Sequence, residues 1–143
     1  MSEETGSILF IGNHYQKPKG FTYIFDELAF RLRDEGWKSF FTSKYKTKIL
    51  KMVDMLLTII KKRHQYQVAE VDVFSGMAFR WAQLSTYLLH ILRKPIILTL
   101  HGGNLPNYAR KYKNRVNKFL DLGTTVVSSA YIYENIKHLR SDI

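Results

Sequence analysis

The chain of 143 residues contains no cysteine. This absence excludes disulfide bonds, thiolate metal ligands and cysteine nucleophiles. It also suits a protein that stays in a reducing compartment. The N-terminal residues MSEETGS lack the basic and then apolar pattern of a secretory signal peptide. We therefore expect a cytoplasmic protein.

Long apolar runs are absent as well. The longest charge-free apolar stretch lies between Arg80 and Arg93 and has 12 residues. A helix that spans a bilayer needs about 20. The sequence therefore predicts no membrane-spanning helix.

Acidic residues are scarce, with 12 Asp and Glu against 22 Lys and Arg, which gives a net charge of +10. Such an excess attracts an anionic partner, which can be nucleic acid, an acidic lipid surface or a phosphorylated substrate. Hydrophobic residues make up 45% and charged residues 24% of the chain, which is typical of a globular domain. We expect residues 1–143 to form a single domain.

The apolar pattern alternates between strands and helices along the whole chain. Short apolar runs predict strands at 7–13, 37–43, 71–75, 95–100 and 124–129. Helical spacing of apolar residues predicts helices at 22–35, 46–66, 77–92, 107–122 and 131–139. This alternation predicts an α/β fold, a Rossmann-like doubly wound parallel sheet of about five strands in three α/β/α layers.

Two of the predicted helices are basic. In the helix at 46–66 we expect an apolar stripe of Ile49, Met52, Val53, Leu56 and Ile60, opposite a charged face of Lys48, Lys51, Lys61, Lys62 and Arg63. The helix at 107–122 carries Arg110, Lys111, Lys113, Arg115 and Lys118.

Basic faces of this kind are either simply solvated or lie against anionic lipid headgroups. The residues expected to bind an anionic membrane at its inner face are Lys61, Lys62, Arg63, Arg110, Lys111 and Lys113. The sequence contains no signature of the common nucleic-acid-binding folds, so no nucleic-acid partner is expected.

Glycine-bearing loops follow the first and fourth predicted strands. In a doubly wound sheet, ligands bind beyond the carboxyl ends of the strands, where the strand order reverses. With the order 3-2-1-4-5, the first and fourth strands flank that crevice. Each loop precedes a helix, whose N-terminus favours anions. The candidate substrate-binding residues are Gly12, Gly20, Phe21, Gly102, Gly103 and Asn104, with His101 as the candidate catalytic residue.

Each candidate also has a purely structural interpretation. His101 can be a turn residue bonded to backbone, and Gly102 and Gly103 can form a tight turn between strand and helix. The glycine spacing matches neither the dinucleotide-binding nor the Walker A motif. Asp72 is expected at the start of its strand, away from the crevice. No paired catalytic carboxylates and no metal site are expected.

Four segments together resemble the family 4 glycosyltransferases. KPKGFTYIFDELAFRLRDEGWKSFFTS is similar to their glycine loop, first helix and second strand, and VDVFSGM to their third strand. KPIILTLHGGNL is similar to their fourth strand and its histidine–glycine loop, and DLGTTVVSSAYIYENI to the fifth strand and the following helix. The likeness extends roughly from Ile8 to Leu139. The family fold, GT-B, stacks two Rossmann-like domains, so this chain resembles one half of it.

The resemblance implies transfer of a sugar from a nucleotide-sugar donor, with retention at the anomeric carbon, to a glycan or lipid-linked acceptor. Gly20 matches the loop glycine whose backbone approaches the donor diphosphate. His101 matches the histidine that contacts the donor sugar beside the reacting centre. No cofactor other than the donor itself is implied.

The chain departs from the family at its C-terminal side. It ends at Ile143, before the second domain, which carries the Arg and Lys that neutralise the diphosphate and the E-x7-E motif that holds the nucleotide. We therefore expect an acceptor-side half that is inactive alone. Such a chain is a cut piece of a longer protein, a gene fragment, or one half of a split enzyme whose partner is a separate C-terminal half. The alternative is a non-enzymatic Rossmann-like module that binds an anionic membrane surface or a partner protein.

Overall fold

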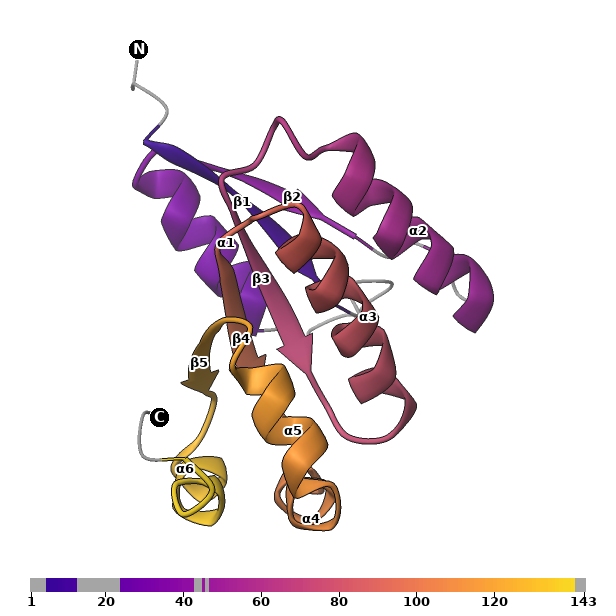
Figure 1. Ribbon diagram of the computed structural model, residues 1–143. Coiled ribbons are helices and arrows are strands. Elements are labelled where there is room, and N and C mark those ends of the chain that lie inside the picture. The colour runs from indigo at the N-terminus through magenta and orange to yellow at the C-terminus, as the bar shows by residue number, and fades with distance from the viewer. Residues whose placement is uncertain (1–4, 13–23, 43–44, 46, 141–143) are drawn as a thin grey trace.

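The computed structural model describes residues 5–12, 24–42, 45 and 47–140 (Figure 1). Strands and helices alternate along these residues. In chain order the elements are β1 (Gly6–Ile11), α1 (Ile24–Asp34), β2 (Trp37–Phe41), α2 (Lys48–Lys61), β3 (Val68–Val73), α3 (Met77–Ile91), β4 (Ile96–Leu100), α4 (Leu105–Lys111), α5 (Lys113–Leu120), β5 (Thr124–Val127) and α6 (Ala130–Ile136).

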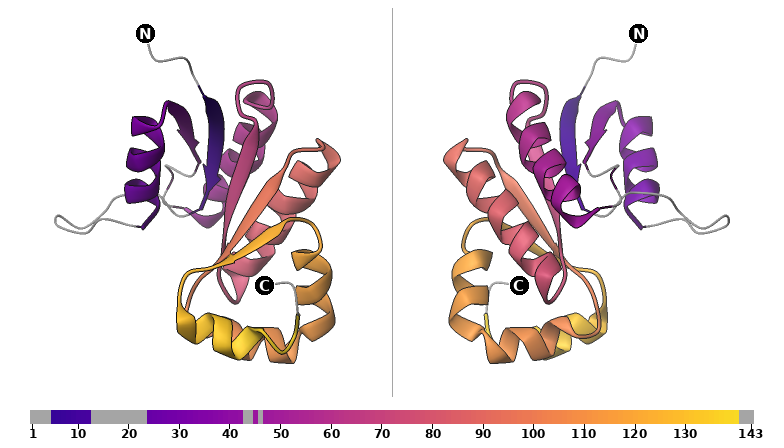
Figure 2. Two further views of the ribbon diagram at one scale, coloured as in Figure 1. Left: turned by 90° about the vertical axis from the view of Figure 1, so that its left-hand side faces the viewer. Right: turned by 90° about the vertical axis from the view of Figure 1, so that its right-hand side faces the viewer.

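All five strands are parallel and form one sheet in the order β2-β1-β3-β4-β5. Helix α1 lies on one face of the sheet, and α2 and α3 lie on the other, so that the views of Figure 2 show three layers. The predicted fold class, a Rossmann-like parallel α/β/α domain, is confirmed. Among the described helices, none combines the length and the apolar character needed to cross a bilayer.

The strand order differs from the predicted 3-2-1-4-5. Strand β3 lies between β1 and β4, with Phe10 paired to Glu70 on one side and Asp72 paired to Thr99 on the other. The prediction failed because apolar strands of similar length carry no local signal of which neighbour they pair with. The order reverses between β1 and β3, so the ligand-binding switch point lies there rather than between the first and fourth strands.

The two faces of the sheet have different cores. The larger core lies under α2 and α3, and residues of β3 that point into it include Ala69, Val71 and Val73. The smaller core, with Ile8 and Phe10 of β1, lies under α1. Because side chains alternate along a strand, the intervening residues of β3 face the α1 side. They include two acids, Glu70 and Asp72.

Helix α2 is turned relative to the prediction. Its buried residues are Lys51, Met55 and Ile59, whereas Ile49 and Val53 of the predicted apolar stripe are exposed. The helix is apolar on more than one side, so its periodicity cannot select the face that packs on the sheet. Lys51, expected on the charged face, instead lies with its ammonium 5.9 Å from the ring centre of Trp81 on α3. Burial lowers the pKa of Lys51.

The single helix expected at 107–122 is two helices, α4 and α5. They meet at Tyr112, whose φ of −118° and ψ of 42° are not helical. The bend lets both short helices bury apolar residues, Leu105 and Ala109 from α4 and Phe119 from α5, in the same core.

Candidate functional site

The candidate site lies at the carboxyl ends of β1, β3 and β4. His101 follows β4 directly, and its backbone N–H donates a hydrogen bond of 2.8 Å to the carbonyl of Val73 at the end of β3. This bond continues the ladder between the two strands and fixes the position of His101 beside β3. The side chain is therefore placed by rigid parallel pairing rather than by a free loop.

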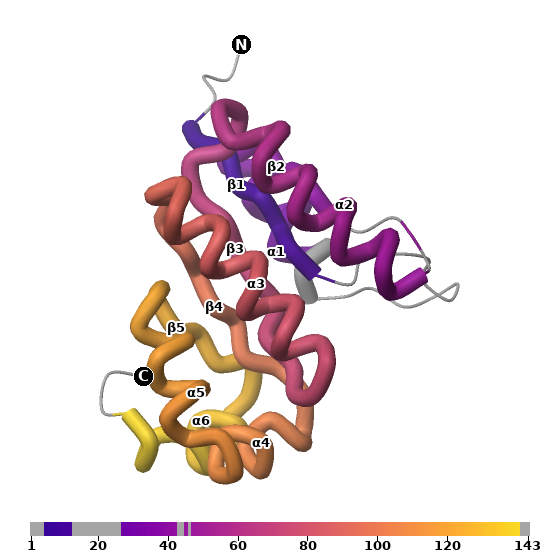
Figure 3. Tube along the Cα trace, turned by 45° about the vertical axis from the view of Figure 1, so that its right-hand side comes forward, coloured from indigo at the N-terminus to yellow at the C-terminus, as the bar shows by residue number. Residues whose placement is uncertain are grey.

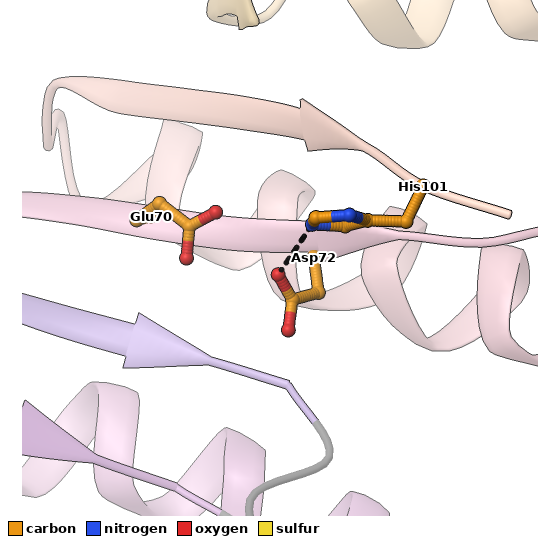
Figure 4. A group of neighbouring side chains, drawn as sticks. All are labelled: Glu70, Asp72 and His101. Carbon is orange, nitrogen blue, oxygen red and sulfur yellow. Dashed lines mark hydrogen bonds and ion pairs between the residues drawn. The ribbon is translucent and has the colours of Figure 1, made fainter. Parts of the chain in front are cut away.

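The imidazole of His101 is held on two sides. Its Nε2 lies 3.2 Å from Oδ1 of Asp72 (Figure 4). Its ring stacks on Phe74, with the ring centres 5.2 Å apart and the planes inclined by 22°. The residue is only 8% exposed. His101 is thus more than a backbone-bonded turn residue, because its side chain has a specific carboxylate partner.

Asp72 does not lie at the start of its strand, as predicted, but is the penultimate residue of β3. The error arose because β3 runs from Val68 to Val73, three residues earlier than the predicted start at 71. A continuous apolar run predicts a strand only from Val71 onward, because Glu70 interrupts the run, although Glu70 lies inside the strand. Asp72 therefore belongs to the carboxyl end of the sheet, beside His101.

Gly12 packs directly against Asp72. A Cβ atom at Gly12 would lie 2.1 Å from Oδ2 and 3.1 Å from Cβ of Asp72. Contacts this short are not tolerated, so a side chain at position 12 would force the carboxylate of Asp72 to move. The end of β1 thus joins the site through Asp72, even though β1 and β4 are not neighbours in the sheet.

Of the three loop residues that follow His101, Gly102 has a backbone conformation that favours glycine, whereas Gly103 and Asn104 are exposed. Gly102 has a φ of +89°, a left-handed conformation that favours glycine. Gly103 is exposed, and its carbonyl accepts a hydrogen bond of 3.5 Å from the hydroxyl of Tyr131. Asn104 is the exposed N-cap of α4 without a side-chain cap bond. The other two candidates, Gly20 and Phe21, lie outside the described residues.

Glu70 is a member of the site that the sequence prediction missed. It is 2% exposed, and neither of its carboxyl oxygens has a hydrogen-bond partner among the described residues. Burial raises its pKa to about 9, and the negative charge of Asp72 acts in the same direction. The nearby Thr99 acts in the opposite direction on this pKa without reaching hydrogen-bonding geometry. Glu70 is therefore a neutral acid at pH 7.

The missed signal is the alternation AEVDV at 69–73. Two acids two residues apart in a strand lie on the same face, and here that face also carries His101, which directly follows β4. Glu70, Asp72 and His101 each offer one metal-ligating atom, and these atoms all lie within 4.8 Å of one another. Of the described residues, these three are the ones whose chemistry suits a bound metal ion.

A cleft of about 450 Å³ opens next to these residues on the α1 side of the sheet. Glu70, Thr99 and His101 form part of its wall. The rest is mainly apolar and comes from β1, α1, β4 and β5, with Ile8, Leu28, Leu32, Ile97, Val126 and Val127 among the lining residues. The cleft is suited to an apolar group whose polar end reaches His101.

The six basic residues proposed for anion binding form two separate groups. Lys61, Lys62 and Arg63 lie at the C-terminal end of α2, close to the start of β3, whereas Arg110, Lys111 and Lys113 follow β4 on α4 and α5 (Figure 3). The first group is therefore at the amino end of the sheet and the second beyond its carboxyl end. The fold does not bring the two groups together.

Several of these cations also have partners within the chain. Lys62 lies over the ring of Phe40, with its Nζ 4.6 Å from the ring centre. Arg110 donates a hydrogen bond of 3.0 Å to the side-chain oxygen of Asn135. Some of these basic side chains are therefore engaged in contacts within the chain.

Comparison of the chain with profiles of known protein families, with curated proteins and with solved structures gives no match.

The raised pKa of Glu70 predicts a specific dependence of stability on pH. Between about pH 4.5 and 9 the folded chain keeps the proton on Glu70, whereas the unfolded chain loses it. The free energy of unfolding should therefore fall as the pH rises through this range, by up to about 1.4 kcal/mol per pH unit. Glu70→Gln should lack this component. Urea unfolding of both proteins at a series of pH values, with a metal chelator present, measures the difference.

The matched control for this measurement is Glu27→Gln. Glu27 is an exposed acid on α1 that pairs with Arg31. Its removal should leave the pH profile nearly unchanged. Parallel profiles for the wild type and Glu70→Gln would show that Glu70 titrates normally and would contradict the prediction.

Proposed function

We propose that the chain is the acceptor-side half of a retaining glycosyltransferase that uses a nucleotide-sugar donor. The observation that carries this proposal is the placement of His101. It lies beside the strand-order switch point, at the carboxyl end of the sheet, with its imidazole held by Asp72. A histidine held in this way presents a fixed, orientated polar group to a ligand in the crevice.

The cleft beside His101 supports an acceptor with an apolar part. Its lining is mostly aliphatic, and Glu70 and Thr99 are its polar members together with His101 and Ser128. A lipid-linked acceptor could place its chain along this lining and its sugar or phosphate at the mouth. We assign the acceptor to this side of the site for that reason.

The donor diphosphate would need cations from elsewhere. The described side chains closest to His101 include the acids Asp72 and Glu70. A leaving diphosphate develops negative charge, and its stabilisation requires Lys, Arg or a metal ion. We infer that a second, nucleotide-binding half supplies this charge, and that the chain alone does not transfer sugar.

The test is an assay of sugar transfer with the purified 143-residue chain, alone and mixed with a candidate nucleotide-binding half that carries the E-x7-E motif. The chain alone should not turn over any nucleotide sugar, and the mixture should. In the mixture, His101→Ala should lower the rate by at least about 100-fold, as expected for loss of a group at the reacting centre. The exposed His64 provides the matched control, and His64→Ala should leave the rate nearly unchanged.

Turnover by the chain alone, at a rate proportional to its concentration, would contradict the need for a second half. Equal rates for His101→Ala and His64→Ala in an active mixture would contradict the role of His101.

A second candidate function, binding to an anionic membrane surface, rests on the exposed side of α2. Apolar residues project from this helix into solvent at positions that repeat every four residues, namely Ile49, Val53 and Leu57. Lys61 continues the same series at the end of the helix. An exposed apolar stripe that ends in basic residues is typical of a helix lying on a lipid surface. A non-enzymatic module would use the same stripe.

The test is flotation of the chain with vesicles that contain or lack anionic phospholipid. Binding should require anionic lipid and weaken as the salt is raised from 0.1 M to 1 M, since the Debye length shrinks from about 10 Å to about 3 Å. Lys61→Glu combined with Arg63→Glu should reduce binding, because each basic residue near the surface contributes about 1 kcal/mol.

Lys111→Glu combined with Lys113→Glu is the matched control, since this pair lies at the opposite end of the sheet from the C-terminal end of α2. It should reduce binding much less. Equal binding to neutral vesicles, or tight binding to duplex DNA with none to vesicles, would contradict this second function.

A further inference from the structure

We propose that Glu70, Asp72 and His101 form a binding site for one divalent transition-metal ion, of which Zn²⁺ is the preferred member. The proposal does not depend on sugar transfer, because it concerns these three side chains alone. It goes against the expectation from sequence that the chain has no metal site.

The backbone places the three ligands before any metal arrives. Glu70 and Asp72 project from the same face of β3, and His101 projects from the position directly after the neighbouring β4 (Figure 4). Their ligating atoms lie within 4.8 Å of one another. Around a tetrahedral ion with bonds of about 2.0–2.2 Å, ligand atoms are about 3.3–3.6 Å apart. Small rotations of the side chains suffice to close that difference.

The carboxyl group of Glu70 supports a bound cation independently of the distances between the three side chains. It is 2% exposed, and neither oxygen has a hydrogen-bond partner among the described residues. A buried carboxyl group without a partner costs stability, and native structures rarely keep one without a reason. A cation between Glu70, Asp72 and His101 would satisfy it and would also offset the charge of Asp72. This is the simplest way to account for two acids side by side in a buried strand.

The donor set decides which ion fits. One imidazole nitrogen with two carboxylate oxygens suits Zn²⁺ or a neighbouring transition metal. Mg²⁺ prefers six oxygen ligands in octahedral geometry, several of them water, and would not favour the nitrogen. Three protein ligands leave a fourth position open, and Glu70 and His101 both border the cleft of about 450 Å³. An added ligand or water in the cleft could reach the ion there.

The experiment uses the full chain without an affinity tag, after dialysis against a chelator and then into clean buffer. Calorimetric titration with ZnCl₂ should show one ion bound per chain. Titration with CoCl₂ should give the visible absorption bands of a tetrahedral Co²⁺ ion, a signature that a structural role of the residues would not produce. MgCl₂ should not compete for the site.

Glu70→Gln keeps the shape of the side chain and removes the ligand charge. It should weaken Zn²⁺ binding at least about tenfold, since even residues that only support a metal ligand cost that much when changed. His101→Gln should have a similar effect. The matched controls are Glu27→Gln and His64→Gln, both at exposed positions, which should bind as the wild type does. Circular dichroism establishes that each variant is folded.

Two results would overturn the proposal. One is that the wild type binds no Zn²⁺ at micromolar concentrations, in which case Glu70 is simply a protonated acid in an apolar wall. The other is that Glu70→Gln and His101→Gln bind Zn²⁺ as tightly as the wild type, in which case the ion sits on surface histidines. Neither result bears on whether a complementary half restores sugar transfer, so the two proposals fail separately.

Discussion

The arrangement at the carboxyl end of the sheet depends on the close packing of Asp72 against the backbone of Gly12. A side chain at position 12 fits only if the Asp72 carboxylate moves, because a Cβ there would lie 2.1 Å from that carboxylate. That carboxylate in turn lies 3.2 Å from Nε2 of His101. The absence of a side chain at Gly12, directly after β1, thus sets the position of a histidine two strands away. The reversal of strand order between β1 and β3 makes this contact possible.

The burial of Glu70 on this same face of the sheet lowers the stability of the folded chain. Its burial keeps it protonated, with a pKa of about 9, in a position where an apolar residue would pack without cost. The opposite face carries the larger core, with buried aliphatic residues such as Val71 and Val73 that alternate with the acids along the same strand. Positions that break the local rules of folding in this way tend to be functional. Sugar transfer and metal binding are two proposals for what that function is.

The sequence predicts the fold class correctly, because its alternation of strands and helices is regular and each apolar run has a suitable length. It does not predict strand order, since pairing between parallel strands is decided by tertiary contacts. The start of β3 was placed too late because Glu70 interrupts the apolar run, and this error moved Asp72 away from the site. Similarly, the apolar residues of α2 occupy more than one side, so Lys51 was assigned to solvent. His101 is correctly predicted to lie at the carboxyl end of the sheet, because it directly follows a strand with a clear apolar pattern.

The most direct test of the central claim is an NMR measurement on the His101 imidazole in metal-free wild type and metal-free Gly12→Ala. A carboxylate only accepts hydrogen bonds, so in the wild type Nε2 should carry a proton that is protected from solvent exchange. The added methyl group of Gly12→Ala should displace Asp72, and the Nε2 proton should then exchange rapidly in a chain that remains folded. An unchanged, protected Nε2 proton in folded Gly12→Ala would contradict the claim that Gly12 positions His101 through Asp72.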